Sequence, residues 1–166
     1  MKRLCFQVFT SPFKICPYIH RMAVHIKKLV VGIDTLDEFA RYLEGEDTHL
    51  DGERVNLVYT RYRPKRGDEI LETGGSIYRI IKGKMCCRQE IIGFEEGKRA
   101  DGRPYCLIVT KPEIIETYHT PHRPFQGWRY LKAADIPKDV GPYEIGSEKA
   151  DIPPEMAEEL RAAGLL

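Results

Sequence analysis

Two adjacent segments rich in β-branched and aromatic residues constrain the fold of this chain more than any other feature. Residues 76–82 (SIYRIIK) and 85–95 (MCCRQEIIGFE) each have the composition of a strand, and Lys82-Gly83-Lys84 lies between them. The glycine fits either a tight hairpin turn or a bulge in one long strand, and the sequence leaves both readings open. In either case the middle of the chain forms sheet, and the other segments have to pack around it.

The flanking segments predict more sheet and one early helix. Residues 35–38 (TLDE) form a capping box, in which the Thr35 side chain accepts from the Glu38 N–H while the Glu38 carboxylate reaches back. The predicted elements are strands over 24–33, 55–63 and 104–110, a helix over about 35–44, a helical turn or short strand at 69–73, a helical turn at 112–116 and irregular chain over 135–143. About five or six strands joined mostly by short loops predict an α+β domain, a small and mostly antiparallel sheet that curls into a partly closed barrel.

The chain divides into a central domain with two appendages of different charge. Residues 22–143 form the expected domain, and residues 144–166 form an acidic tail with an amphipathic helix over 153–163. Residues 1–21 carry four basic and no acidic residues and are interrupted by two prolines. We expect this extension to be foreign to the domain, with Met22 as the biological start and a targeting peptide as the alternative.

Cysteine usage and hydropathy indicate a reducing, cytoplasmic setting without a membrane partner. The chain has five cysteines and no CxxC motif, which favours buried reduced thiols. Adjacent Cys86 and Cys87 are expected to point to opposite faces of a strand, a poor geometry for a disulfide or a shared metal. No apolar run approaches the roughly 18 residues that a membrane span needs.

Residues 123–131 (RPFQGWRYL) have the composition of a ligand-binding segment. They contain the only tryptophan, Trp128, together with two arginines, a glutamine and two further aromatic residues. Flat apolar rings among guanidinium groups suit a planar, anionic ligand such as a nucleotide or a nucleic-acid strand. The alternative is that the aromatic rings fill the core. The nearby His119, His122 and Glu116 have a spacing that a metal site would allow, but exposed loop histidines explain it as well.

A basic stretch in the middle of the chain provides candidate phosphate contacts. Residues 59–88 hold eight basic residues against three acidic ones, well short of the charge of a dedicated duplex-DNA binder. Arg61 and Arg63 are expected on one face of a strand. Gly74-Gly75 before Ser76 forms either an anion-binding nest of backbone N–H groups or a plain turn.

Four sequence runs carry a resemblance to a known family. HIKKLVVGIDTLDEF, GGSIYRIIKG, RQEIIGFEE and RPFQGWRYL resemble the bacterial family of domain of unknown function 1489, over about residues 24–140. A looser similarity is to PUA-like domains, which the turn Gly67-Asp68 and the run 91–95 (IIGFE) resemble. That similarity implies a small barrel whose cleft binds RNA or a modified base.

The sequence therefore favours a binding module for RNA, single-stranded DNA or a nucleotide, without a cofactor or metal. The candidate ligand-binding residues are Arg61, Arg63, Ser76, Tyr78, Lys82, Arg88, Arg123, Gln126, Trp128 and Arg129. One alternative is a small hydrolase acting on a nucleoside-type substrate, with Lys82 and Glu90 as a catalytic pair. Another is a protein–protein adaptor that uses the acidic tail. Whether the chain is an enzyme is left open.

Overall fold

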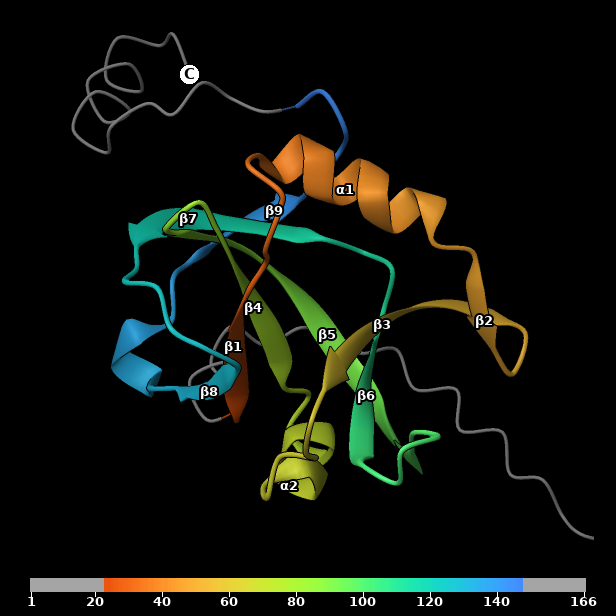
Figure 1. Ribbon diagram of the computed structural model, residues 1–166. Helices are drawn as coiled ribbons and strands as arrows, with labels where there is room; N and C mark the ends of the chain where they lie inside the picture. Colours follow the sequence, from red (N-terminus) through yellow and green to blue (C-terminus); the bar gives the residue numbers. More distant parts are fainter. Residues whose placement is uncertain (1–22, 148–166) are drawn as a thin grey trace, which may run out of the picture.

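One long strand organises the part of the chain that the computed structural model describes, residues 23–147 (Figure 1). This strand, β5 (Lys84–Lys98), pairs along one edge with β4 (Ser76–Ile81). Along its other edge the first half pairs with β7 (Ile115–Pro121) and the second half with β6 (Pro104–Thr110). All three pairings are antiparallel, and each contains a register shift, so β5 bends between its two halves.

The remaining strands extend the sheet on both sides of this centre. On one side β6 pairs with β3 (Glu53–Thr60), which pairs with β2 (Thr48–Leu50). On the other side β4 pairs in parallel with β1 (His25–Leu29), which pairs with β8 (Trp128–Leu131). β9 (Asp139–Pro142) pairs with β7. The described strands form a nine-stranded sheet in which β2 and β8 end the path unpaired with each other. The α+β class is confirmed, but the sheet stays open and barrel closure is not observed.

The early helix begins where the capping box predicts. Helix α1 (Leu36–Gly45) follows Thr35, whose hydroxyl accepts from the Glu38 N–H at 3.1 Å. The Glu38 carboxylate accepts from the N–H of Asp34 at 3.0 Å, one residue before the expected position. A second helix, α2 (Gly67–Glu72), occupies the segment for which helix and strand were both open. A short 3₁₀ helix covers Ala133–Asp135.

The turn between β4 and β5 is a tight hairpin, which settles the choice left open by the sequence. Ile81 pairs with Lys84, and the two residues between them, Lys82 and Gly83, both have positive φ, at 44° and 78°. These values match a type I′ turn, which suits the twist of a two-residue hairpin.

Several predicted elements differ from the structure. The expected helical turn at 112–116 is a bend that leads directly into β7, and residues 135–143 are not irregular, because they include β9. The short strands β2 and β8 were not predicted. β8 and β9 pair with strands that are not their neighbours in the sequence, so local composition does not reveal them, whereas β2 was missed although it pairs with the next strand, β3, across a tight turn. The expected extension and tail helix fall on residues 1–22 and 148–166, outside the described range.

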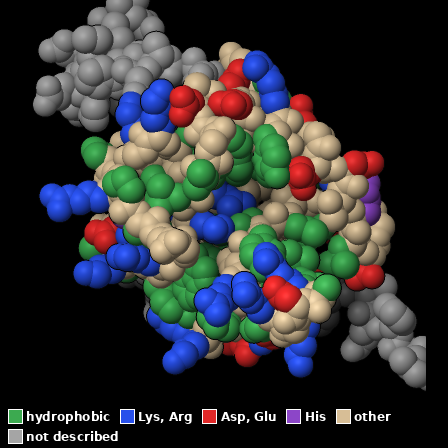
Figure 2. Space-filling model, viewed as in Figure 1, with side chains coloured by type: hydrophobic (Ala, Val, Ile, Leu, Met, Phe, Trp, Pro, Cys, Tyr) green, Lys and Arg blue, Asp and Glu red, His purple; other side chains and the backbone are tan. Residues whose placement is uncertain are grey.

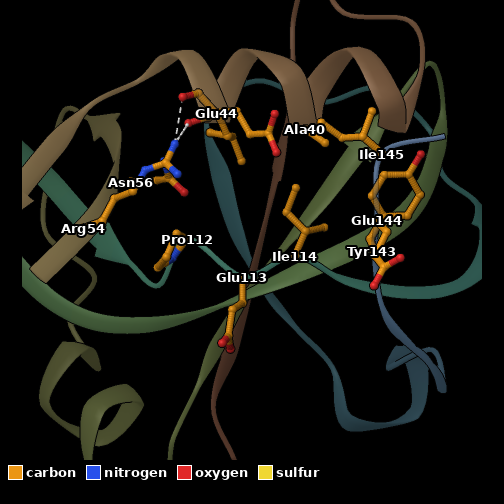
Figure 3. A pocket seen from close by; sticks show the side chains of 11 residues that line it. Ala40, Glu44, Arg54, Asn56, Pro112, Glu113, Ile114, Tyr143, Glu144 and Ile145 are labelled. Atoms are coloured by element: carbon orange, nitrogen blue, oxygen red, sulfur yellow. Dashed lines mark hydrogen bonds between the residues drawn. The ribbon is translucent and has the colours of Figure 1, made fainter. Parts of the chain in front are cut away.

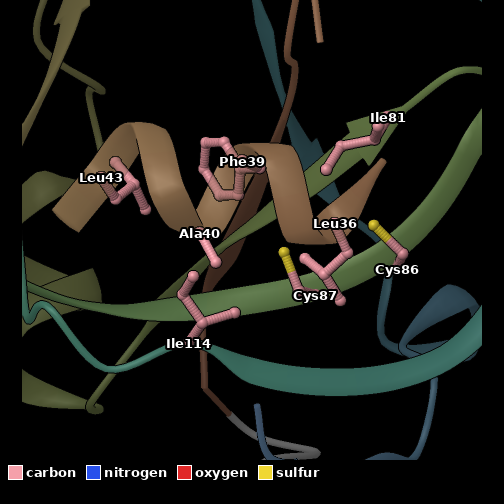
Figure 4. Packing of buried hydrophobic residues seen from close by; sticks show 8 residues of the cluster. All are labelled: Leu36, Phe39, Ala40, Leu43, Ile81, Cys86, Cys87 and Ile114. Carbon is pink, nitrogen blue, oxygen red and sulfur yellow. The ribbon is translucent and has the colours of Figure 1, made fainter. Parts of the chain in front are cut away.

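The sheet has two faces that are covered differently. On the face that we call the helix face, α1 packs at one end and α2 at the other. The cluster under α1 consists of Leu36, Phe39, Ala40, Leu43, Ile81, Cys86, Cys87 and Ile114 (Figure 4). The cluster under α2 consists of Val24, Ile26, Val58, Ile70, Ile77, Ile91 and Ile108. On the opposite face, the loop face, Tyr78, Ile80, Met85 and Leu131 pack against Phe125 and Ile136 from the segment that surrounds β8.

The two adjacent cysteines join a single cluster rather than opposite faces. Cys86 and Cys87 both pack under α1 (Figure 4). The β5–β7 pairing shifts register between Met85 and Cys87, and this irregularity breaks the strand alternation on which the expectation rested. Cys86, Cys87 and Cys106 are free and buried, as expected for reduced thiols.

Candidate functional site

Two cationic side chains lie at the middle of the helix face, between the two apolar clusters. The parallel register of β1 and β4 pairs Lys28 with Arg79, so the two side chains leave the same face next to each other. The preceding pair in the same alternation, Ile26 and Ile77, belongs to the cluster under α2. Figure 2 shows a hollow near the centre of this view, between the positions of α1 and α2, with Lys or Arg side chains at its bottom.

Arg79 is a buried guanidinium without an acidic partner among the described residues. Only 4% of the residue is exposed. Its Nη2 donates to Oε1 of Gln89 at 3.0 Å, and its guanidinium carbon lies 5.4 Å from the centre of the Phe39 ring. Its Nε is buried and has no hydrogen-bond partner among the described residues. Burial lowers the pKa of Arg79 to about 10, although the nearby Cys87 thiol acts in the opposite direction.

Lys28 adds a second positive charge, for which residues 23–147 provide no counter-ion. Its side chain is half-buried, and within residues 23–147 it forms no hydrogen bond or ion pair. Burial, followed by the charge of Arg79, lowers the pKa of Lys28 below its ordinary value. A buried charge is normally paired, because removing it from water costs several kcal/mol. This pair of cations is therefore electrostatically prepared for an anion.

A chain of amide groups holds Arg79 in place. Gln89, which accepts from Arg79, donates through Nε2 to Oδ1 of Asn56 at 3.1 Å and to the carbonyl of Lys111 at 3.0 Å. Asn56 in turn donates to the carbonyl of Leu43 near the end of α1 at 3.4 Å. Because Gln89 and Asn56 are fully buried, these bonds fix the guanidinium before any ligand arrives.

An aromatic wall lies beside Lys28. The β1–β8 register pairs Lys28 with Trp128, and the indole meets the Tyr130 ring edge-on with centroids 5.2 Å apart. Both rings are half-buried and pack against the cluster under α2. The hydroxyl of Tyr130 accepts from the backbone N–H of Arg66 at 3.0 Å. Trp128 is thus neither sealed in the core nor free on the surface, and its indole stands next to the cationic pair.

Three of the sequence-predicted residues lie instead on the loop face, inside a satisfied network. Arg88 donates through Nε and Nη2 to the two carboxylate oxygens of Asp139 at 2.8 and 2.7 Å, and through Nη1 to the Ser76 hydroxyl at 3.2 Å. Although burial acts against the charge, these bonds and the charge of Asp139 raise the pKa of Arg88. Ser76 and Tyr78 are fully buried, and burial raises the pKa of Tyr78.

The glycine pair before β4 ends α2 and does not form an anion nest. Gly74 has φ of 66°, and its N–H donates to the carbonyl of Leu71 at 3.3 Å. The N–H of Gly75 donates to Ile70 at 2.7 Å, and the N–H of Ser76 donates to Nδ1 of His25 at 3.0 Å. Every N–H of the expected nest already has an acceptor, so the plain turn is confirmed.

The remaining predicted residues are spread over the surface. Arg61 and Arg63 lie beyond the end of β3, so the strand alternation that placed them on one face does not apply. Arg61 lies over the Tyr62 ring, whereas Arg63 pairs with Asp68 at 2.5 Å and lies over the Phe94 ring.

Lys82, which directly follows the last residue of β4, pairs with Asp34 at 3.2 Å. Glu90 pairs with Lys111 and lies opposite Ser76 in the register, so the proposed Lys82–Glu90 pair is not brought together.

The 123–131 segment is divided between the two faces. Arg123, Gln126 and Arg129 are exposed, and Arg129 lies over the Phe125 ring, on the loop face. Since adjacent residues of a strand point in opposite directions, Trp128 points to the helix face while Arg129 points away from it. Of the ten predicted residues, Trp128 alone lies beside the cationic pair, and the structure does not gather the ten into one site.

The histidines of this region do not converge on a metal site. His119 Nε2 lies 3.7 Å from the Glu116 carboxylate, whereas the His122 ring contacts the Lys27 ammonium at 2.9 Å. Within residues 23–147 no group of three His, Cys, Asp or Glu side chains is arranged to hold a metal ion. Burial also raises the pKa of Cys87, which opposes its use as a nucleophile.

A second cavity, of about 370 Å³, lies between α1, β3 and the chain on either side of Tyr143 (Figure 3). Its guanidinium, that of Arg54, donates to the carbonyls of Leu43 at 3.1 Å and Glu44 at 2.8 Å, where it caps the end of α1. Glutamates 44, 113 and 144 also line it. With its cation occupied and several carboxylates around it, this cavity suits an anion less well than the surroundings of Lys28 and Arg79.

Sequence reasoning missed Lys28 and Arg79, which the structure makes the centre of the site. The available signal was the charge of Arg79 in the middle of the strand pattern SIYRIIK, whereas Lys28 had no signal of its own, because Lys27 precedes it in HIKKLVV. A charged residue in a strand that is buried on both faces is unusual and favours a function.

A model of a protein family, described as a protein of unknown function (DUF1489), matches residues 26–166. The chain belongs to this family. The match includes the acidic tail, so the expectation that the resemblance ends near residue 140 was wrong. No curated protein and no solved structure matches the chain, and the comparisons give no support to a PUA-like relationship. None of the helices within residues 23–147 has the length and apolar character needed to cross a membrane.

Proposed function

We propose that this protein is a binding module for a phosphate-bearing ligand of the nucleotide class, held in the hollow over Lys28 and Arg79. The observation that carries the proposal is the adjacent pair of cations without a carboxylate partner among the described residues. Phosphate oxygens accept charge-assisted hydrogen bonds from guanidinium and ammonium groups, and the unpartnered Nε of Arg79 is a donor that such an oxygen would satisfy.

The aromatic wall supports a nucleotide over a simple inorganic anion. Trp128 stands next to Lys28, and an indole face stacks on any base, worth about 1–3 kcal/mol per base. The position of the cationic pair between α1 and α2 favours one nucleotide, free or at the end of a strand, over a long track along the surface.

Thermal unfolding and calorimetric titration test this proposal. The panel consists of inorganic phosphate, a mononucleotide, the matching nucleoside and a short single-stranded RNA. We expect the phosphate-bearing compounds to stabilise the protein and the nucleoside to have no effect, with about 2.7 kcal/mol of stabilisation at a concentration of 100 times Kd. If only the RNA binds, the ligand is the end of a strand. If the mononucleotide binds equally well, the ligand is a free nucleotide.

Variants locate the ligand. Arg79→Met and Lys28→Met should each weaken binding at least about tenfold, in line with the loss of one charge-assisted bond. Lys27→Met is the matched control, because Lys27 is adjacent in β1 but points to the loop face, where it contacts His122. If no phosphate-bearing compound shifts the unfolding temperature of the unmodified protein, the proposal is wrong.

A further inference from the structure

The environment of Lys28 resembles that of an amine prepared for covalent chemistry. Its side chain is half-buried beside a second cation and, within the described range, has no acidic partner that would hold its proton. Lysines desolvated or placed next to another cation are the ones that attack carbonyl carbons. Lys82 and Lys111, in contrast, are each paired with a carboxylate.

We propose that Lys28 condenses with an aldehyde or ketone that also carries a phosphate or carboxylate group, which Arg79 binds. This inference rests on the proposed anion-binding hollow and adds a reaction to it. The geometry supplies both parts of such a ligand, because Lys28 and Arg79 are register partners on neighbouring strands. The indole of Trp128, on the other side of Lys28, offers a flat wall to a conjugated or aromatic carbonyl compound.

The step balances without an external oxidant or reductant. The neutral Nζ amine attacks the carbonyl carbon, and one N–H proton moves to the oxygen to give a neutral carbinolamine. A single proton from solvent then binds the hydroxyl group, which leaves as water. The nitrogen lone pair forms the C=N bond that replaces the C=O bond, and the product is the cationic iminium. The bound anion then offsets the charges of the iminium and of Arg79.

The direction of the pKa shift agrees with this chemistry. Burial and the neighbouring Arg79 lower the pKa of Lys28, so more of its amine is neutral near pH 7 than for an ordinary lysine. An anion that binds Arg79 reduces the part of this pKa shift that the charge of Arg79 causes.

Borohydride trapping with pyridoxal phosphate tests the inference. The probe has an aldehyde, a phosphate and a planar ring, and reduction of the imine fixes it to the lysine as a stable amine. At limiting probe we expect one label per chain, located on Lys28 by peptide mass spectrometry. Label should be lost in Lys28→Arg and retained in Lys27→Arg, which alters the adjacent lysine on the opposite face. Arg79→Met should slow labelling at least about tenfold.

Two analogues separate this inference from the binding function. Pyridoxal lacks the phosphate and should label slowly, whereas pyridoxamine phosphate lacks the carbonyl and should protect Lys28 from labelling. If pyridoxamine phosphate stabilises the protein but pyridoxal phosphate labels the exposed lysines as fast as Lys28, the hollow binds anions and the imine chemistry is refuted. If neither pyridoxamine phosphate nor any phosphate-bearing compound of the first panel stabilises the protein, the binding function fails as well.

Discussion

The hairpin formed by β4 and β5 carries two buried arginines with opposite environments. On the loop face, Arg88 forms a bidentate pair with Asp139 and a bond to Ser76. On the helix face, Arg79 has an amide, an aromatic ring and an unpartnered Nε. Both arginines are less than a tenth exposed. The difference indicates that Arg88 stabilises the fold, while Arg79 costs the fold stability and is better explained by a ligand.

Removing the partner of Arg88 gives the largest expected effect. Asp139→Ala leaves a buried guanidinium without its carboxylate, and we expect a loss of about 3–5 kcal/mol in the free energy of unfolding. Chemical denaturation measures this loss directly. If Asp139→Ala unfolds as easily as the unmodified protein, the contrast between the two arginines disappears.

Replacing Arg79 should raise the free energy of unfolding, whereas loss of Asp139 lowers it. Arg79→Met substitutes an apolar side chain of similar length for a charge that has no counter-ion within the described part of the chain, and we expect a gain of about 1–4 kcal/mol at pH 7. The same denaturation experiment measures it, with Arg88→Met as the matched variant on the loop face, which should destabilise. A loss of stability in Arg79→Met would show that its bonds to Gln89 and Phe39 are worth more than its burial costs.

Trp128 sharpens the comparison, because it lies on the face of Arg79. Trp128→Ala should reduce nucleotide affinity by about 1–3 kcal/mol through loss of stacking, and Trp128→Phe should retain most of it. Titration of both variants measures the effect, after circular dichroism has shown that each is folded. Equal affinity in all three proteins would remove the indole from the site.

The smallest expected effect is a dependence of the free energy of unfolding on pH, which the lowered pKa of Lys28 causes. Its pKa is lower in the folded chain than in the unfolded one, so between the two values the unfolded state binds more protons. Stability should therefore rise with pH across that window relative to Lys28→Met. Denaturation of both proteins from pH 7 to about 9.5, below the pKa of Arg79, measures the difference. A difference that is constant with pH would contradict the shift.

The sequence predicted the local features and missed those that depend on distant strands. Thr35 and Glu38 are three residues apart, so the capping box could be recognised directly, whereas the Lys82–Gly83 turn was left open between a hairpin and a bulge. The Arg88–Asp139 pair joins residues 51 positions apart. Neither composition nor spacing indicates which arginine of the hairpin meets an acid.

The sequence does not show which residues of β1 and β8 face the helices, because this depends on the register of the strands. Lys27 and Lys28 are adjacent and chemically identical, and only the register with β4 and β8 decides which of them enters the hollow. Trp128 and Arg129 were both predicted as ligand-binding residues, but Arg129 points away from the helix face because adjacent strand residues alternate. A one-residue change of phase would exchange both pairs.

The position of β1 between β4 and β8 has a consequence for synthesis of the protein. Trp128 follows its partner Lys28 by 100 residues, which corresponds to about 5–20 s of translation at about 5–20 residues per second. During that interval one edge of β1 is available to strands of other nascent chains. We expect the ribosome-bound chain to bury its two cations last, so that premature termination before β8 yields a product prone to aggregation rather than a smaller working domain.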